Sequence, residues 1–262
     1  MLMLDPKIKA LFSTQQSLFT QMMALRGEEY RALENRRTQQ VMLGGKPYFV
    51  KQHYGVGWKE IFKNLLQLRL PVVSAKNEWC ALQRLHELHV PAAEVKGYGS
   101  RGLNPATRQS FLLTSALPPH ISLEDFCKNW RQTPPTFRLK QQLITETARI
   151  ARILHTNGIN HRDFYLCHLL LDKQSLASAP LLYLIDLHRA QLRKRTPERW
   201  IIKDLAGLYF SSKDIGLTQR DLLRFMKEYR NKTLDLILTK ERAFWQRVKK
   251  RGDKLYRQHA NG

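Results

Sequence analysis

The sequence predicts an α+β fold of two lobes, with a strand-rich N-lobe over residues 1–117 and a helical C-lobe over residues 118–262. Short apolar runs bounded by turn residues gather in the first part, whereas the second part consists mostly of long amphipathic stretches. Between them, Pro118-Pro119 cannot continue a central strand and stiffens the connection. The length of 262 residues allows two lobes of about 100–150 residues each.

In the N-lobe, residues 5–26 are expected to form one amphipathic helix, because apolar side chains recur near helical spacing. The segment TQQVMLGGKPYFVKQHY predicts a β-hairpin that turns at Gly44-Gly45. Basic and apolar residues over 58–70 predict a second helix, and another is expected from about Ala75 to His89, each ended by a proline. The strand SFLLTSAL closes the lobe.

In the C-lobe, Ser122 is the expected N-cap of a helix that starts at ISLEDFC. A long helix is expected over residues 138–156, ended by Asn157-Gly158. The apolar runs LCHLLLD and LLYLIDL flank a polar turn at 173–180 and predict a short hairpin. The remainder of the chain is expected to be helical and basic.

The net formal charge of +22 indicates an anionic partner: a nucleic acid, an acidic membrane surface, an anionic glycolipid or an acidic protein. Residues 189–262 hold 20 Lys/Arg against 8 Asp/Glu and supply more than half of the excess. Three cysteines without a CxxC pair favour neither a disulfide framework nor a thiolate zinc site. The segment MLMLDPKIKALF lacks the pattern of a signal peptide. The sequence has no run of about 18 apolar residues, so no transmembrane helix is predicted.

The segment GINHRDFYLCHLLLD carries the most informative motif, an HRD tripeptide that ends in Asp163. His168 follows five residues later, then an apolar strand, and a second apolar strand ends in Asp186. This order matches the catalytic loop and the metal-binding strand of protein-kinase-like enzymes. Asp163 is therefore predicted to orient an acceptor hydroxyl and accept its proton, and Asp186 to ligate Mg²⁺.

The N-lobe supplies the two further residues that a protein-kinase-like fold requires. Lys51 ends the apolar strand YFVK, and Glu78 lies in the first turn of the helix expected from about Ala75 to His89. Lys51 is predicted to contact the α- and β-phosphates of ATP and to be held by Glu78. Each of the two is also an ordinary surface residue type, so these roles depend on the order of all the motifs.

The sequence departs from the protein-kinase pattern at three places. No GxGxxG precedes Lys51, so Arg36 or Arg37 is a candidate substitute for glycine amides in phosphate binding. His168 stands where the pattern has an Asn that ligates metal, and it is expected either to ligate metal or to hydrogen-bond Asp163. The segment after Asp186 is too short for a peptide-docking platform.

The segments HRDFYLCHLLLD, IDLHRAQ, KDLAGLYFSS, ISLEDFC, GLNPATRQSF and EIFKNLLQLRLPV together resemble the lipopolysaccharide core heptose(I) kinase family of the WaaP type. The resemblance spans about residues 28–230. It implies a kinase-like fold and ATP- and Mg²⁺-dependent phosphorylation of a heptose in the inner core of lipopolysaccharide. It also implies a cytoplasmic protein that is peripheral at the inner membrane of a Gram-negative bacterium. In addition, it implies that the HRD aspartate, Asp163, is the catalytic residue.

The basic charge agrees with that resemblance, since an anionic glycolipid in an anionic membrane would be the partner. Four basic residues after Asp186 are candidates to hold acidic sugars: Arg189, Arg193, Lys194 and Arg195. A solvated basic loop is an equal alternative for them. The helix WKEIFKNLLQLRL could lie on the membrane surface or pack on the first lobe.

Three alternative functions remain at this stage. A protein kinase, for instance one acting on tyrosine, shares the motifs, but the short segment after Asp186 disfavours it. A kinase acting on heptose II or on the acidic sugar Kdo shares the chemistry. A nucleic-acid-binding module would use the basic charge, but no RNP, zinc-finger or helix-turn-helix signature supports specific nucleic-acid binding.

Overall fold

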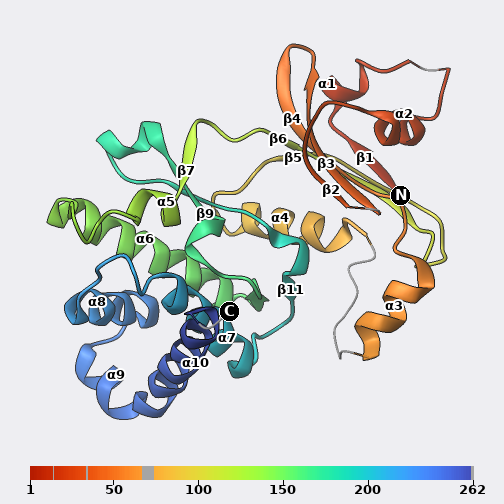
Figure 1. Cartoon of the computed structure of the whole chain (residues 1–262). Helices are drawn as coiled ribbons and strands as arrows, with labels where there is room; N and C mark the ends of the chain where they lie inside the picture. The colour runs from red at the N-terminus through yellow and green to blue at the C-terminus, as the bar shows by residue number, and fades with distance from the viewer. Residues whose placement is uncertain (14, 34, 67–73, 261–262) are drawn as a thin grey trace. The chain divides into compact units, whose positions relative to one another are not determined.

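The computed structural model describes residues 1–13, 15–33, 35–66 and 74–260. It divides into two compact units. The first comprises Met1–His86 and Ala93–Leu117, and the second comprises Glu87–Ala92 and Pro118–Gly262. The described strands of the first unit form one sheet, and helices dominate the second, so the predicted α+β class is confirmed (Figure 1).

The first unit is built on a six-stranded antiparallel sheet with the order β1-β5-β6-β4-β3-β2. Its strands are β1 (Leu2–Leu4), β2 (Glu28–Leu33), β3 (Arg36–Leu43), β4 (Lys46–His53), β5 (Val95–Arg101) and β6 (Gln109–Ser115). The predicted hairpin is confirmed as β3–β4, with Leu43 paired to Lys46. Gly44 and Gly45 have φ values of 53° and 75°, which a tight two-residue turn requires and which glycine adopts without strain.

The single helix expected over residues 5–26 is wrong. The structure has strand β1, then the short α1 (Pro6–Lys9) and, further along the chain, α2 (Leu18–Ala24). The Asp5 side chain accepts a hydrogen bond from the amide of Lys7, and Pro6 occupies the first helical turn, so a helix begins there. The polar run Ser13–Ser17 offers no apolar face to bury, so the helix does not continue.

Two further helices of the first unit are α3 (Gly57–Leu66) and α4 (Lys76–Glu87). The helix expected from Ala75 to His89 is confirmed within two residues. Its inner face buries Ala81, Leu82 and Leu85. The helix expected over residues 58–70 is confirmed as far as Leu66, and its predicted end at Pro71 lies outside the described residues.

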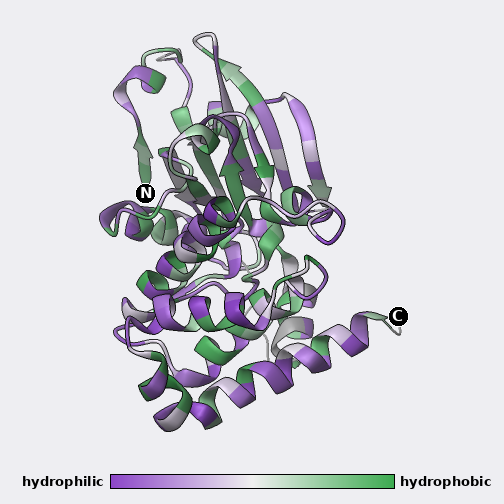
Figure 2. Ribbon diagram, turned by 90° about the vertical axis from the view of Figure 1, so that its left-hand side faces the viewer, coloured by the Kyte–Doolittle hydropathy of each residue, from purple (hydrophilic) through white to green (hydrophobic). Residues whose placement is uncertain are grey.

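The second unit is mainly helical. Its helices are α5 (Leu123–Cys127), α6 (Phe137–Thr156), α7 (Glu198–Ser211), α8 (Gln219–Arg230), α9 (Leu234–Lys240) and α10 (Arg242–Ala260). Ser122 caps α5 as predicted, since its hydroxyl accepts from the amide of Asp125. The long predicted helix is confirmed as α6, and polar residues, purple in Figure 2, run along much of α10.

Short strands flank the loop that carries Asp163 in this unit. The predicted hairpin is confirmed as β9 (Leu169–Asp172) with β10 (Leu182–Leu184), and β7 (His120–Ser122) pairs with β9 on its other edge. A second pair, β8 (Ile159–Asn160) with β11 (Gln191–Leu192), holds the start of the loop beside the segment that follows Asp186. None of the described helices is both long and apolar enough to cross a membrane.

Candidate active site

The loop that carries Asp163 is anchored by a carboxylate that lies inside the second unit. Asp204, on α7, is 1% exposed. Its two oxygens accept hydrogen bonds from the main-chain amides of His161, at 2.7 Å, and Arg162, at 2.8 Å. Arg162 has φ of 76°, a left-handed conformation that is costly for a non-glycine residue, so Asp204 stabilises a strained loop beside Asp163.

Asp204 was not identified from the sequence. The segment KDLAGLYFSS contributed to the family resemblance, but no role was assigned to its carboxylate. The available signal was a single Asp within the largely apolar helix IIKDLAGLYF, because a charge on a buried helix face needs a specific partner. His155, also buried, approaches Asp204 at 3.4 Å and contacts the Tyr229 hydroxyl at 2.9 Å, which completes a buried polar network.

His161 links the Asp163 loop to the segment that precedes Asp186. Its Nε2 donates to the main-chain oxygen of Ile185 at 2.8 Å, and the ring is fully buried. Burial lowers the pKa of His161, so the ring is neutral at pH 7. A neutral, buried ring bonded to a main-chain oxygen positions the loop and is not suited to act as a base.

The Asp163 carboxylate lies at the surface of this loop and is engaged by an arginine. Nη1 of Arg189 lies 2.9 Å and 3.0 Å from its two oxygens. The Asp163 side chain is 17% exposed and that of Arg189 is 33% exposed. The residue predicted as the acceptor base and one of the four predicted substrate-binding residues are thus in direct contact.

Asp186 lies at the end of the β9–β10 hairpin, in a left-handed conformation with φ of 60° and ψ of 50°. One of its oxygens contacts Nδ1 of His188, and the other lies 3.4 Å from Nε2 of His168. The left-handed conformation of a non-glycine residue is a local strain of the kind that gathers at functional sites.

His168 lies between the two candidate aspartates. Its Nδ1 donates to the main-chain oxygen of Asp163 at 2.7 Å, and its Nε2 faces Asp186. Burial acts to lower the pKa of His168, but interactions with Cys167, with that main-chain oxygen and with the Asp186 charge raise it to about 9. The hydrogen bond holds one proton on Nδ1, so a metal ion that binds Nε2 would displace the second proton, which the raised pKa keeps on the ring at pH 7.

Within the part of the chain that the structure describes, no three His, Cys, Asp or Glu residues form a metal cluster. A Mg²⁺ ion bound to a nucleotide needs fewer, since one or two carboxylates hold it together with phosphate oxygens and water. Asp186, with the Nε2 of His168 beside it, meets that requirement.

The first unit holds the other predicted pair. Lys51 on β4 forms an ion pair with Glu78 on α4. The Glu78 side chain is 7% exposed and that of Lys51 is 24% exposed, so the pair is shielded and the lysine still reaches the surface. Arg36 and Arg37 start β3, and Thr38, the next residue, is paired with Lys51 across the sheet.

The remaining predicted substrate residues differ in their surroundings. Arg193 donates to the side-chain oxygens of Asn160, at 2.5 Å, and Gln191, at 2.7 Å, which places it beside the catalytic loop. Lys194 and Arg195 are exposed.

Comparisons with known proteins agree over most of the chain. Residues 20–229 match the model of the lipopolysaccharide kinase (Kdo/WaaP) family. A lipopolysaccharide core heptose(I) kinase WaaP of Pseudomonas aeruginosa is 46% identical over 257 residues, covering 97% of this chain and 96% of the relative. A WaaP of Escherichia coli K12 is 51% identical over 225 residues and 85% of each chain. A solved structure described as WaaP in complex with acyl carrier protein has a TM-score of 0.84 and 41% identity, covering 98% of this chain and 99% of that one.

Proposed function

The chain belongs to the lipopolysaccharide kinase (Kdo/WaaP) family, and we propose that it transfers a phosphoryl group from ATP to a hydroxyl of heptose I in the inner core of lipopolysaccharide. The observation that carries this proposal is the Asp163 loop, held by Asp204 and joined through His168 to Asp186, in a chain whose relatives at 46–51% identity are named heptose(I) kinases. Those names favour heptose I over heptose II, Kdo or a protein as the acceptor.

The residues divide the chemistry between them. Asp163 would orient the acceptor hydroxyl and accept its proton. Asp186, with His168, would hold Mg²⁺, which neutralises phosphate charge when bound. Lys51, held by Glu78, would contact the α- and β-phosphates of ATP, and Arg36 or Arg37 would replace the absent glycine-rich loop. The shielded Lys51–Glu78 pair and the partly exposed carboxylate of Asp186, which His168 and His188 flank, fit these ligands.

Arg189 adds a condition to this mechanism. Because it binds both oxygens of Asp163, an acceptor hydroxyl must share or displace that contact before Asp163 can take a proton. An anionic group on the acceptor would draw the guanidinium away. Arg189, Arg193, Lys194 and Arg195 would hold the acidic sugars next to the heptose.

Helix α3 supports peripheral binding to the cytoplasmic face of the inner membrane. Trp58, Phe62 and Leu66, spaced four residues apart on one helix face, are 50%, 57% and 86% exposed. The rings of Trp58 and Phe62 stack with centroids 5.8 Å apart. An exposed aromatic face flanked by Lys59 and Lys63 has the chemistry of a helix that lies in the surface of an anionic bilayer.

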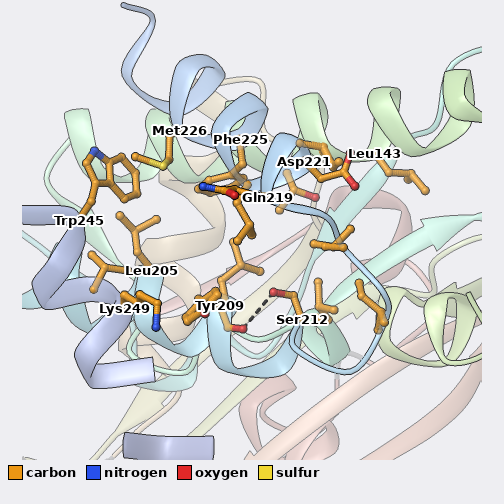
Figure 3. Close-up of a pocket in the computed structure, with 18 of the residues that line it drawn as sticks. Leu143, Leu205, Tyr209, Ser212, Gln219, Asp221, Phe225, Met226, Trp245 and Lys249 are labelled. Atoms are coloured by element: carbon orange, nitrogen blue, oxygen red, sulfur yellow. Dashed lines mark hydrogen bonds between the residues drawn. The ribbon is translucent and has the colours of Figure 1, made fainter. Parts of the chain in front are cut away.

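An acidic protein of the acyl carrier type is the second proposed partner, since a solved relative is described with one. The second unit contains a cavity of about 490 Å³ between α6, α7, α8 and α10. Its lining is mostly apolar, as Leu143, Leu205, Phe225, Met226 and Trp245 show (Figure 3). An acyl chain delivered by such a carrier would fit an apolar cavity of this kind, and the basic surface would attract the carrier itself.

The carrier proposal is tested by thermal unfolding of the purified chain with carrier protein that bears or lacks a long acyl chain. The acylated form should raise the unfolding temperature more, because it fills the cavity. Leu143→Trp, which narrows the cavity, should remove that difference, while the exposed Leu236→Trp on α9 should keep it. Equal stabilisation by both forms would contradict acyl binding.

Mass spectrometry of core oligosaccharide from cells with and without the protein tests the main proposal. Core oligosaccharide from cells that contain the protein should carry a phosphate on heptose I, and oligosaccharide from cells that lack the protein should not. The purified chain should also transfer label from radioactive ATP to core glycolipid and not to a generic peptide. Phosphate on another sugar, or labelling of the peptide alone, would contradict it.

A further inference from the structure

Four cations surround one indole ring in the second unit. The charged groups of Arg162, Arg193, Arg199 and Lys203 lie 5.4, 6.0, 5.4 and 5.6 Å from the centroid of the Trp200 ring. We name these five residues the Trp200 cluster. They come from the catalytic loop, from the segment after β11 and from the first turns of α7.

The mutual repulsion of these cations is only partly offset by the protein. A cation–π contact contributes about 0.5–2 kcal/mol, depending on how well it is shielded from water. Burial, followed by the positive charge of Arg162, lowers the pKa of Lys203. Burial, followed by the charge of Arg189, lowers the pKa of Arg162. The protein thus holds like charges close together and partly out of water, which favours an anion among them.

The carboxylates near the cluster are already engaged by other groups. Asp163 is bound by Arg189, and both oxygens of Asp204 accept main-chain amides. Glu198, in the first turn of α7, forms an ion pair with Arg247 at 2.6 Å. Positive charge therefore remains in excess around Trp200.

Two buried donors in the cluster have no hydrogen-bond partner among the described residues: Nε of Arg162 and Nε1 of Trp200. An unpaired buried donor lowers stability by about 1–3 kcal/mol, so an acceptor atom of a ligand is expected to bind such groups when the protein holds its ligand. The oxygens of a carboxylate or a phosphate would supply acceptors for them.

The position of the cluster on α7 favours the same ligand. Arg199 and Lys203 lie in the first two turns of this 14-residue helix, where the helix dipole opposes cations and favours anions. An anion held there would be stabilised by the dipole and by the cations together.

We propose that the Trp200 cluster binds a carboxylate or phosphate group of the acceptor glycolipid, beside the hydroxyl that is presented to Asp163. This inference rests on the proposed function. It assigns the anion to the acceptor rather than to ATP, because Arg162 directly precedes Asp163, the proposed acceptor base, whereas the residues proposed for the ATP phosphates, Lys51 and Glu78, belong to the other unit.

Steady-state kinetics of a double variant, Arg199→Gln with Lys203→Gln, test the inference. Loss of even one charge-assisted hydrogen bond predicts an increase of at least about 10-fold in KM for the acceptor. The KM for ATP and the kcat at saturating acceptor should stay near the wild-type values. Lys203→Arg, which keeps the charge, should retain most of the affinity, and the exposed Lys254→Gln on α10 is the matched control for loss of charge.

Modified acceptors identify the anion. Wild-type protein should bind more weakly to an acceptor whose carboxylates are reduced to alcohols, or to one stripped of phosphate, in direct titrations without nucleotide. The double variant should no longer distinguish the modified acceptor from the native one. If its unfolding temperature falls, the comparison is made with Lys203→Gln alone.

Two negative outcomes are distinguishable. A wild-type chain that phosphorylates the glycolipid, with a double variant of unchanged acceptor KM, would show that the cations only pack on Trp200 and would overturn the inference alone. A wild-type chain that leaves the glycolipid unphosphorylated would overturn the proposed function together with the inference.

Discussion

Asp163 lies on the loop that Asp204 anchors, and the two carboxylates differ in burial and in their partners. Asp204 is buried and accepts two main-chain amides, so its charge serves to hold the loop. Asp163 is partly exposed and is bound by Arg189, so its oxygens can be reached by a substrate that displaces the guanidinium. Burial and hydrogen-bond partners distinguish the anchoring carboxylate of Asp204 from the carboxylate of Asp163 that we propose to be reactive.

Asp204→Asn should reduce kcat and lower the free energy of unfolding by about 1–3 kcal/mol, the cost of an unsatisfied buried donor. The asparagine amide would face a main-chain N–H that now donates to a carboxylate oxygen. Chemical denaturation and steady-state kinetics measure both effects. Asp214→Asn, at a side chain that is 61% exposed, is the control and should change neither. A variant with full stability and wild-type kcat would exclude Asp204 as the anchor.

His168→Asn should change the metal preference of the reaction. The Nδ1 hydrogen bond leaves Nε2 directed at Asp186, and imidazole favours Mn²⁺ over Mg²⁺ more than an amide oxygen does. Activity titrated with each metal should therefore show a higher Mn²⁺ to Mg²⁺ ratio for wild type than for His168→Asn. Identical metal dependence in wild type, His168→Asn and His168→Ala would remove His168 from the ligand set.

The sequence predicted the residue types of the site better than their contacts. Lys51 and Glu78 are paired as expected, because motif order along strand and helix determines their placement. Asp204 and the contact between Arg189 and Asp163 depend on side chains that meet from segments distant in sequence, which no local spacing reports. His168 was expected to ligate metal or to bond Asp163, and it bonds the main chain of that residue rather than its carboxylate.

At the scale of elements, the start of α8 combines a cap with two ion pairs. Thr218 and Asp221 form a reciprocal capping box. Asp221 is 3% exposed and also binds Lys140 of α6, at 2.9 Å, and Arg224, at 3.1 Å. It thereby ties α8 to α6 beside the apolar cavity that it helps to line (Figure 3).

Asp221→Asn should make the protein less stable at neutral pH and less sensitive to acid. Burial acts to raise the pKa of Asp221, but Lys140 and Thr218 outweigh it and lower that pKa below 3.8. The stabilisation is fully present above the unfolded-state pKa and is lost as the pH falls through the lower folded-state pKa. Denaturation between pH 7 and pH 3 should show a smaller acid-induced loss for the variant. Parallel pH profiles for wild type and variant would contradict this role.

Helices and strands were predicted correctly where a single local sequence pattern determines them. The β3–β4 hairpin follows from Gly44-Gly45, and α6 follows from its apolar periodicity. The N-terminal segment failed because helical spacing of apolar residues cannot show that a polar run interrupts the helix, nor that Leu2–Leu4 pairs with the distant β5. The pair β8–β11 was missed for the same reason, since two residues on each side carry no pattern.

At the scale of the whole molecule, the charge of +22 has two proposed uses. Part of it surrounds the catalytic loop, where it would hold the acceptor, and the rest would attract an anionic bilayer or an acidic carrier protein. The exposed aromatic face of α3 would add an apolar contribution to membrane binding that charge alone does not give.

Binding to vesicles that contain anionic lipid should weaken as salt rises past about 0.15 M, where the Debye length is near 8 Å. Trp58→Ala with Phe62→Ala should weaken binding at every salt concentration, because these rings supply apolar contact. Cosedimentation measures both, with neutral phosphatidylcholine vesicles as the control. Binding that does not respond to salt would contradict the electrostatic part, and equal binding by the double variant would contradict the role of α3.

The most direct test of the account is the transfer of label from radioactive ATP to core glycolipid by wild type and by Asp163→Ala. A residue that orients the acceptor and takes its proton contributes about 10²–10⁴ in rate, so the variant should lose at least that factor. Its unfolding temperature should stay close to that of wild type, because Asp163 is partly exposed and Asp204, not Asp163, holds the loop. Near-normal phosphorylation by a folded Asp163→Ala protein would contradict the account.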